Sequence, residues 1–220
     1  MIRGAIFDFD GTLFDTMGIW DELIAEAFCE LGCEYTPELL NKLKVMSFQE
    51  STAFLKETFH IPETEEEIRE RIDRMAEEQY FYKVLPKPGA PEFLAALHSR
   101  GVKMCIATAT ERYMVKAALE RCGLASYFSD ILACADTGRG KEAPDIFRAA
   151  LKSLGTERDD TAVFEDSAHA LRTAARDGFR TVGIFDRHEV ESETAREFSK
   201  LYLPDFRDMS GFWVLFGEQA

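Results

Sequence analysis

The sequence predicts an α/β protein in which a doubly wound, mostly parallel sheet is interrupted by a helical insertion. From about residue 86 onwards, short apolar segments alternate with amphipathic ones, which is typical of parallel strands joined by helices. Another short apolar segment lies near the N-terminus. Between them, residues 17–83 show one helical pattern after another and no segment with the character of a strand. Two regions of different organisation are therefore expected in one chain.

The first strand is expected at Ala5–Phe9, because this segment is short, apolar and aromatic and Gly11 follows it. Apolar residues at helical spacing then predict four helices, with Pro37 and Pro62 at breaks between them. These helices are expected at Thr16–Leu31, Thr36–Lys44, Phe48–Phe59 and Thr64–Phe81. The acidic run Glu63–Glu78 also contains arginines and fits a solvated helix face.

The remaining elements follow from short apolar strands and from glycines that end helices. Helices are expected at Phe93–Arg100, Glu111–Cys122, Pro144–Leu154 and Ser167–Asp177, and strands at Val102–Ala107, Ile131–Cys134, Thr161–Phe164 and Thr181–Phe185. The chain is therefore expected to divide into a sheet-bearing core of residues 1–16 and 84–220 and a helical domain of residues 17–83. Hinges between the two are expected near Thr16 and Leu85.

Composition and charge narrow the classes of partner. Hydrophobic residues make up 46% of the 220-residue chain, which is typical of a folded globular protein. The net charge of −14 disfavours nucleic acid and anionic membranes as partners, since both would repel the protein. Five scattered cysteines indicate reduced thiols rather than disulfides. The apolar runs are too short for a membrane span, and Asp8 and Asp10 would interrupt a signal peptide, so a cytoplasmic protein is expected.

Functional residues are expected just beyond the strands, because doubly wound sheets bind ligands at the carboxyl ends of their strands. The polar residues in such positions are Asp8 and Asp10 after the first strand, Thr108 after the second, Lys141 in the loop after the third, and Glu165 with Asp166 after the fourth. Each has a simpler alternative role: the acids and the threonine could cap turns or helices, and the lysine could be solvated.

Taken together, these residues suit metal-assisted phosphoryl transfer. On an extended chain the carboxylates of Asp8 and Asp10 leave the same face and repel each other unless a cation or a shared proton intervenes. Carboxylate oxygens suit Mg²⁺, whereas a hydroxyl, backbone amides and a lysine suit phosphoryl oxygens. The chain has no loop of the GxxxxGK[ST] type, so a P-loop nucleotide enzyme is disfavoured.

The same residues, in the same order, resemble the motifs of the haloacid dehalogenase superfamily, in particular its small-molecule phosphatases and β-phosphoglucomutase-like proteins. The matches are Asp8-Phe9-Asp10-Gly11-Thr12 with DxDGT, Thr108 with the second motif, Lys141 within Gly140–Phe147 with GKPxPDxF, and Glu165-Asp166-Ser167 with the fourth. The resemblance spans about Ile2 to Phe185. The chain departs from the motifs where Glu142, Ala170 and Leu171 replace the usual proline, glycine and isoleucine.

The resemblance implies a Rossmann-like catalytic core and identifies the helical domain as a mobile cap. It implies that Asp8 attacks phosphorus to form an aspartyl-phosphate, and that Asp10 protonates the leaving oxygen and later activates water. Two ligand sets are implied: Thr108, the amide of Ala109 and Lys141 for the phosphoryl oxygens, and the Asp8 carboxylate, the Asp10 backbone carbonyl and Asp166 for Mg²⁺, with Glu165 close by.

The favoured function is an Mg²⁺-dependent phosphatase of small phosphate esters, with a hexose-phosphate mutase as the alternative. Mutases of the family bind the distal phosphate with a cap arginine, but Phe48 stands at that position here, which leaves Lys44 as an anchor. A dehalogenase is disfavoured because such members lack the second acid of the first motif, here Asp10. A silent regulator is disfavoured because every catalytic residue type is retained. Trp20, Lys44 and Phe48 could contact substrate, or alternatively serve in packing or on the surface.

Overall fold

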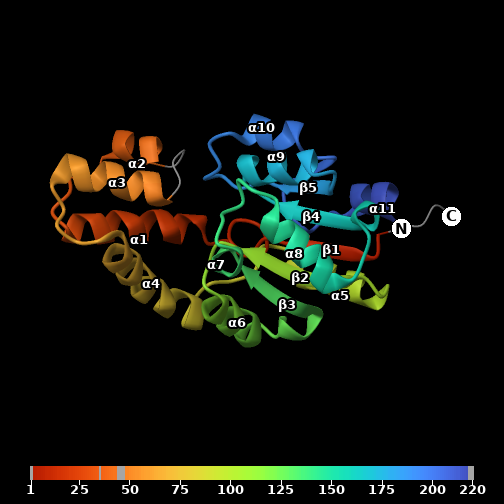
Figure 1. Ribbon diagram of the computed structural model, residues 1–220. Coiled ribbons are helices and arrows are strands. Elements are labelled where there is room, and N and C mark those ends of the chain that lie inside the picture. The colour runs from red at the N-terminus through yellow and green to blue at the C-terminus, as the bar shows by residue number, and fades with distance from the viewer. Residues whose placement is uncertain (1, 35, 44–47, 218–220) are drawn as a thin grey trace. The chain divides into compact units, whose positions relative to one another are not determined.

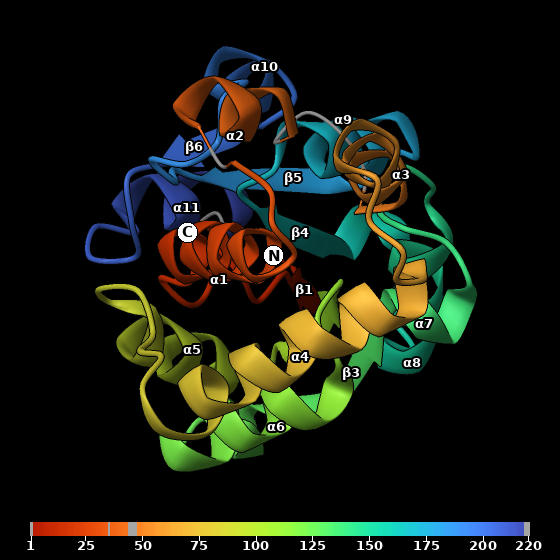
Figure 2. The same ribbon diagram turned by 90° about the vertical axis from the view of Figure 1, so that its left-hand side faces the viewer.

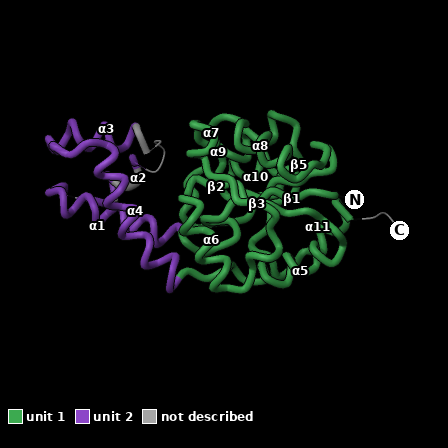
Figure 3. The backbone as a smooth tube through the Cα atoms, turned by 60° about the horizontal axis from the view of Figure 1, so that its bottom comes forward, with its two compact units in different colours: residues 1–16, 84–220 green, residues 17–83 purple. Residues whose placement is uncertain are grey.

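The structure is a computed structural model that describes residues 2–34, 36–43 and 48–217 (Figure 1). The chain forms two compact units, which Figure 3 distinguishes by colour. Unit 1 comprises residues 1–16 and 84–220, and unit 2 comprises residues 17–83. Each unit has a buried apolar core of its own.

Unit 1 is built on a six-stranded parallel sheet with the strand order β3-β2-β1-β4-β5-β6. Its strands are β1 (Gly4–Phe7), β2 (Lys103–Thr108), β3 (Phe128–Ala133), β4 (Thr161–Glu165), β5 (Arg180–Ile184) and β6 (Leu201–Leu203). Its helices are α5 (Ala90–Ser99), α6 (Arg112–Arg121), α7 (Cys134–Thr137), α8 (Asp145–Leu154), α9 (Ala168–Arg176), α10 (Ser192–Glu197) and α11 (Ser210–Phe216). The predicted doubly wound α/β fold is confirmed, and its strand order reverses between β1 and β4, where such sheets bind ligands.

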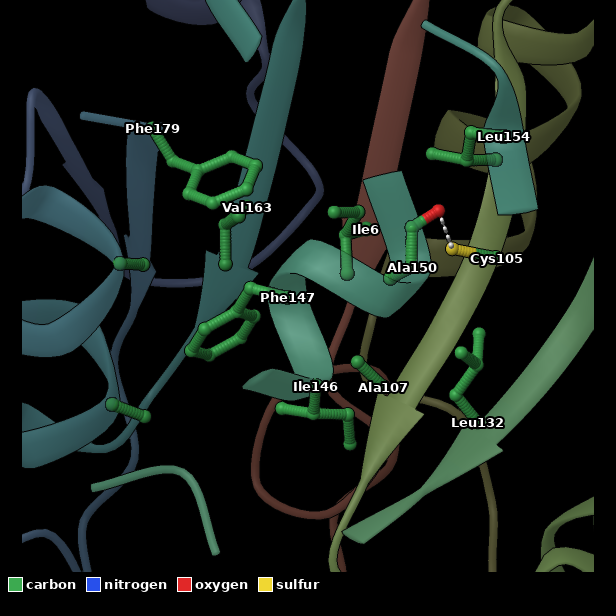
Figure 4. Close-up of a cluster of buried hydrophobic side chains, with 12 residues drawn as sticks. Ile6, Cys105, Ala107, Leu132, Ile146, Phe147, Ala150, Leu154, Val163 and Phe179 are labelled. Atoms are coloured by element: carbon green, nitrogen blue, oxygen red, sulfur yellow. Dashed lines mark hydrogen bonds between the residues drawn. The ribbon is translucent and has the colours of Figure 1, made fainter. Parts of the chain in front are cut away.

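Side chains alternate along the strands and divide the sheet between two apolar layers. Ile6 of β1 and Val163 of β4 are paired in register and belong to the layer covered by α8 and α9. Figure 4 shows this layer, in which Phe147 of α8 lies beside Val163. The rings of Phe147 and Phe179 lie 6.3 Å apart. The layer therefore fixes the helices that follow β3 and β4 against the centre of the sheet.

The opposite face of the sheet carries an aromatic layer. Phe7 and Phe164, the next residues along β1 and β4, stack with ring centroids 4.3 Å apart. Phe93 of α5 packs edge-on against Phe7 and against Phe212 of α11, at 6.4 and 5.1 Å. In Figure 2, α5 lies to the left of β1 and α8 to its right. Burial of each such ring contributes about 1.5–3 kcal/mol, so this layer holds the carboxyl ends of β1 and β4 rigidly together.

Unit 2 consists of helices, as the spacing of apolar residues predicts. They are α1 (Met17–Glu30), α2 (Pro37–Leu43), α3 (Phe48–Phe59) and α4 (Glu65–Tyr82). A capping box begins α4, because the Thr64 side chain accepts a hydrogen bond from the amide of Glu67 and the Glu67 carboxylate accepts one from the amide of Thr64. Phe28 of α1 and Ile68 and Ile72 of α4 share one buried cluster.

The two chain segments that lead to residues 17–83 run side by side within unit 1. The amide of Asp15 donates to the carbonyl of Leu85 at 3.2 Å, and the amide of Lys87 donates to the carbonyl of Leu13 at 2.7 Å. Backbone hydrogen bonds therefore join the two segments to each other just before and just after residues 17–83.

Two boundaries differ from the prediction because glycines redirect the chain. β1 ends at Phe7 rather than Phe9, since the chain then turns through Gly11, whose φ of 73° favours glycine. α5 begins three residues earlier than expected, at Ala90, because Gly89 adopts a left-handed conformation directly before it. A Cβ at Gly89 would lie 2.5 Å from the backbone of Phe206, so that position has room only for glycine.

Other differences lie in β3 and near the C-terminus. β3 begins at Phe128 rather than Ile131, and Cys134 starts helix α7 instead of ending the strand. The elements α10, β6 and α11 are additions to the predicted series. None of the helices in the described part of the chain combines the length and the apolar character that crossing a membrane requires.

Candidate active site

Three buried carboxylates meet at the carboxyl ends of β1 and β4. Asp8 directly follows β1, and Glu165 and Asp166 close β4. Phe7 pairs with Phe164 in register, and the amide of Asp8 donates to the carbonyl of Phe164 at 2.9 Å. One carboxylate oxygen from each acid lies within 4.8 Å of the other two. The relative exposure of the three residues is 7%, 1% and 5% in sequence order, so water screens their charges poorly.

Lys141 brings a positive charge into this cluster from the loop that precedes α8. Its ammonium group donates to Asp8 Oδ1 and, at 2.5 Å, to Glu165 Oε1. The loop is held by Glu142, which accepts a hydrogen bond from the amide of Gly140 at 3.1 Å. A glutamate therefore shapes the loop where the resembling motif has proline. Lys141 is buried with the acids, in contrast to a solvated lysine.

Mutual repulsion and burial perturb the pKa values of the cluster. Burial raises the pKa of Asp8 to about 7, with Glu165 and Asp10 adding to the rise and Lys141 opposing it. Burial, Glu165 and Asp8 also raise the pKa of Asp166 well above its ordinary value. Burial alone would lower the pKa of Lys141, but Asp8 and Glu165 outweigh it and raise that pKa. Lys141 thus contacts two of the three acids, Asp8 and Glu165.

The donor set of this cluster fits a hard divalent cation. Its groups are carboxylate oxygens, which are the ligands that such a cation prefers, and all three acids are buried. Thr12 fixes one ligand in place, because its buried hydroxyl donates to Asp166 Oδ1 at 2.8 Å. The Glu165 carboxylate is fixed by the amides of Asp166 and Ser167, each at 3.1 Å.

The carboxylate of Asp10 has different partners from that of Asp8. The extended chain that would place both side chains on one face ends at Phe7, and the turn that follows carries Asp10 towards β2. There the Thr16 hydroxyl donates to Asp10 Oδ1 at 2.7 Å, and the Thr110 hydroxyl donates to Asp10 Oδ2 at 2.6 Å. Asp10 therefore lies outside the group of three carboxylates that could hold a metal through side-chain oxygens.

Thr108 closes β2, the neighbour of β1 on the side opposite β4. Its buried hydroxyl oxygen accepts a hydrogen bond from the amide of Thr110 at 3.0 Å, which leaves its own proton for an external acceptor. Ala109 follows at the exposed start of this turn. The predicted residues thus come together in two groups, one around Asp8 and one around Asp10.

Sequence reasoning missed several residues of the site. The hydrogen-bonding roles of Thr12 and Thr110 were not predicted, because short polar residues are common in turns. The only signal was their place in the sequence, Thr12 at the end of the first motif and Thr110 two residues after Thr108. Lys87 is buried and pairs with the equally buried Asp186 at 2.9 Å. Its charge lowers the pKa of Asp166, against the larger effect of burial. No sequence spacing connects this lysine with the acids.

The structure does not describe equally the three residues of the helical domain that could contact substrate, Trp20, Lys44 and Phe48. Trp20 donates from its indole nitrogen to the hydroxyl of Tyr80 at 2.8 Å, a contact within unit 2. This contact agrees with a packing role for Trp20. Lys44 lies outside the described residues, and the side chain of Phe48 is likewise outside what the structure describes.

Comparison with known proteins places these observations in a family. The family model described as haloacid dehalogenase-like hydrolase matches residues 2–177. The "Phosphorylated carbohydrates phosphatase" of Thermotoga maritima is 25% identical over 181 residues, which cover 82% of this chain and 84% of that protein. The plasmid-encoded CbbY protein of Cupriavidus necator is 31% identical over 199 residues, covering 82% and 77%.

Solved structures share the fold over nearly the whole chain. CbbY from Rhodobacter sphaeroides in complex with phosphate superimposes with a TM-score of 0.83 at 24% identity, covering 96% of this chain and 97% of that one. A putative β-phosphoglucomutase from Thermotoga maritima gives a TM-score of 0.76 at 23% identity, covering 97% and 99%.

Proposed function

The chain belongs to the haloacid dehalogenase-like hydrolases, and from this premise we propose that it is an Mg²⁺-dependent phosphatase of small phosphate esters. The observation that carries the proposal is the buried group of Asp8, Glu165, Asp166 and Lys141 at the switch point of the sheet. In this proposal the group supplies a nucleophilic carboxylate, a set of ligands for a metal ion and a cation for phosphate. The phosphatase name of the Thermotoga maritima relative supports the same activity.

In the proposed first step, an oxygen of Asp8 attacks phosphorus, and the bond from phosphorus to the leaving oxygen breaks. Asp10 gives its proton to the leaving oxygen, so an alcohol departs and an aspartyl-phosphate remains. In the second step Asp10 takes a proton from water as that water attacks phosphorus. Inorganic phosphate leaves and the carboxylate of Asp8 is restored.

Other residues of the chain would hold the phosphoryl group during both steps. Thr108, the amide of Ala109 and Lys141 are proposed to donate to its oxygens. The hydroxyl of Thr108 already accepts from the amide of Thr110, which orients it as a donor. Lys141 contacts both Asp8 and Glu165, so it can move little when substrate binds.

Mg²⁺ would be held by the Asp8 carboxylate, the Asp10 backbone carbonyl and Asp166, with Glu165 close by. The chemistry it supplies when bound is neutralisation of the negative charge shared by the acids and the phosphoryl group. Thr12 and the amides around Glu165 keep these acids oriented, as their hydrogen bonds indicate.

Unit 2 is proposed to act as a cap that excludes water from the site, with hinges near Thr16 and Leu85. The pairing of the two connecting segments supports this proposal, because bonds such as Asp15 to Leu85 give both hinges a fixed base in unit 1. Phosphorylated carbohydrates are the substrate class we propose first. One relative is named for them, and another CbbY structure was solved with xylulose-1,5-bisphosphate.

The test is a screen for release of inorganic phosphate from sugar phosphates, nucleotides and glycolytic phosphate esters, with Mg²⁺ and with a chelator. The Asp8→Asn protein, purified in parallel, controls for contaminating phosphatases. We expect Mg²⁺-dependent release from at least one phosphorylated carbohydrate. Release no greater than that of the control from every substrate would contradict the proposal. Conversion of a hexose 1-phosphate into its 6-phosphate without net release would establish the mutase alternative instead.

A further inference from the structure

We propose that Thr110 is a positioning residue that holds the carboxylate of Asp10 in place for proton transfer to and from the reacting oxygen. This inference rests on the proposed function, since it assigns a task to a residue beside its acid and base. In the proposed mechanism, Thr110 neither forms a bond to phosphorus nor carries the transferred proton.

The geometry at Asp10 carries the inference. Its two carboxylate oxygens accept from two different hydroxyls, Thr16 at 2.7 Å and Thr110 at 2.6 Å. Thr16 is completely buried, and Thr110 is 6% exposed. Two short hydrogen bonds, one to each oxygen, fix both the position of the carboxylate and the rotation of its plane. A proton carrier needs this orientation, because proton transfer depends on hydrogen-bond reach to the reacting oxygen.

Thr110 also links Asp10 to the proposed phosphoryl-binding turn. Its amide donates to the hydroxyl oxygen of Thr108 at 3.0 Å, while its own hydroxyl reaches Asp10. One turn after β2 therefore sets the distance between the group that binds the phosphoryl oxygens and the group that moves the proton. Thr16 belongs to the other connection, at the start of the helical insertion, and so gives no such link.

A hydroxyl suits this task because it can donate to a carboxylate and accept from a carboxylic acid. The proton itself passes between Asp10 and the leaving oxygen or water, and Thr110 changes only the direction of its hydrogen bond. Valine has nearly the same shape as threonine, but its side chain can neither donate a hydrogen bond to Asp10 nor accept one from it. Serine can do both.

The experiment compares wild type with Thr110→Val and Thr110→Ser on two phosphate esters. One is an alkyl phosphate, whose leaving oxygen needs a proton, and the other is an aryl phosphate, whose leaving group needs none. The rate of aspartyl-phosphate formation is measured in a single turnover, because the second step is the same for both esters. We expect Thr110→Val to lower this rate on the alkyl phosphate about 10- to 100-fold, the range for loss of a hydrogen bond to a charged group. The loss of this rate on the aryl phosphate should be clearly smaller, the half-saturating substrate concentration should stay nearly constant, and Thr110→Ser should restore most of the rate.

Thr181→Val is the matched control for loss of a buried hydroxyl. Thr181 lies on β5, and its hydroxyl donates to the backbone carbonyl of Phe198 rather than to Asp10. This variant should leave the alkyl-to-aryl ratio of the rates of aspartyl-phosphate formation unchanged. A double variant closes the argument: if Thr110 acts through Asp10, Thr110→Val adds little to the loss already caused by Asp10→Asn on the alkyl phosphate.

Two results would overturn the inference. One is an equal loss of the rate of aspartyl-phosphate formation on both esters, or an effect confined to the half-saturating substrate concentration, which would make Thr110 a structural or substrate-binding residue. The other is a full additional loss in the double variant. If Thr110→Val does not fold, the same ratio is read from Thr110→Ala. Absence of hydrolysis by wild type would instead refute the proposed function, so the two failures are distinguishable.

Discussion

Asp8 and Asp10 stand two residues apart, yet the regions around them differ in kind. Asp8 lies among charged groups, with two further acids and Lys141 in contact or close by. Asp10 lies between two neutral hydroxyls, those of Thr16 and Thr110. Pairs of acids whose surroundings differ in this way commonly divide the tasks of nucleophile and proton carrier. The contrast teaches that the turn at Gly11 gives the two carboxylates different surroundings, although they are only two residues apart.

The largest expected effect tests the charged region. Asp8→Asn keeps the shape of the side chain but removes the nucleophile, so kcat should fall by about four orders of magnitude or more. No phosphoenzyme should be detectable by mass spectrometry after an acid quench. Hydrolysis by this variant at a rate near wild type would show that Asp8 does not form a covalent bond to phosphorus.

Removal of the metal should have the next largest effect. Excess chelator should abolish turnover, and added Mg²⁺ should restore it, because the excess negative charge of the cluster repels a phosphate ester. Asp166→Ala should bind Mg²⁺ at least about tenfold more weakly, as a calorimetric titration would measure. Asp159→Ala, an exposed acid of the same unit, is the control and should bind Mg²⁺ like wild type. Full activity in chelator would argue against a metal-dependent mechanism.

Asp10→Asn tests the region around Asp10, where the hydroxyls of Thr16 and Thr110 donate to the carboxylate. On an alkyl phosphate, kcat should fall about 10²- to 10⁴-fold, which is typical of loss of a general acid or base. On an aryl phosphate the first step should suffer less than the second, so the aspartyl-phosphate should accumulate as a mass increase after acid quench. Wild-type rates on alkyl phosphates would leave Asp10 as a residue that merely shapes the turn.

Much of the fold could be predicted because each apolar run ends at a residue with a clear conformational preference. Gly155 directly follows α8, Gly178 lies two residues beyond the end of α9, and both have positive φ. The elements after β5 escaped prediction because they are short. β6 has three residues, and α11 is a two-turn helix whose burial depends on contacts with Phe93, far away in sequence. Such elements are stabilised by tertiary packing, which no local pattern records.

The candidate site shows the same limit. Sequence order placed Asp8, Glu165 and Asp166 at one edge of the sheet, because neighbouring parallel strands end at the same edge. The partners of Asp10 could not be read from the sequence, since Thr110 is separated from it by 100 residues. The contact exists only because the turn after β1 meets the turn after β2.

The smallest expected effect is a pH dependence of stability that arises from the charged region alone. Burial raises the pKa of Asp8 in the folded protein to about 7, whereas in an unfolded chain this pKa would lie near its ordinary value of 3.8. The folded state therefore binds this proton more tightly. Its contribution to stability is complete below the unfolded pKa and is lost as pH rises through the folded pKa.

In chelator, the melting temperature of wild type should consequently fall relative to that of Asp8→Asn between about pH 5 and about pH 8, by a few degrees for a chain of this size. Mg²⁺ should raise the melting temperature of wild type more at the higher pH, because cation and proton compete for the same oxygens. Asp159→Ala, which removes an exposed acid, should follow the pH trend of wild type, whereas Asp10→Asn should weaken that trend, because Asp10 adds to the rise in the pKa of Asp8. A melting difference between wild type and Asp8→Asn that stays constant with pH would show that Asp8 is ionised throughout this range, and that Lys141 outweighs both its burial and the neighbouring acids.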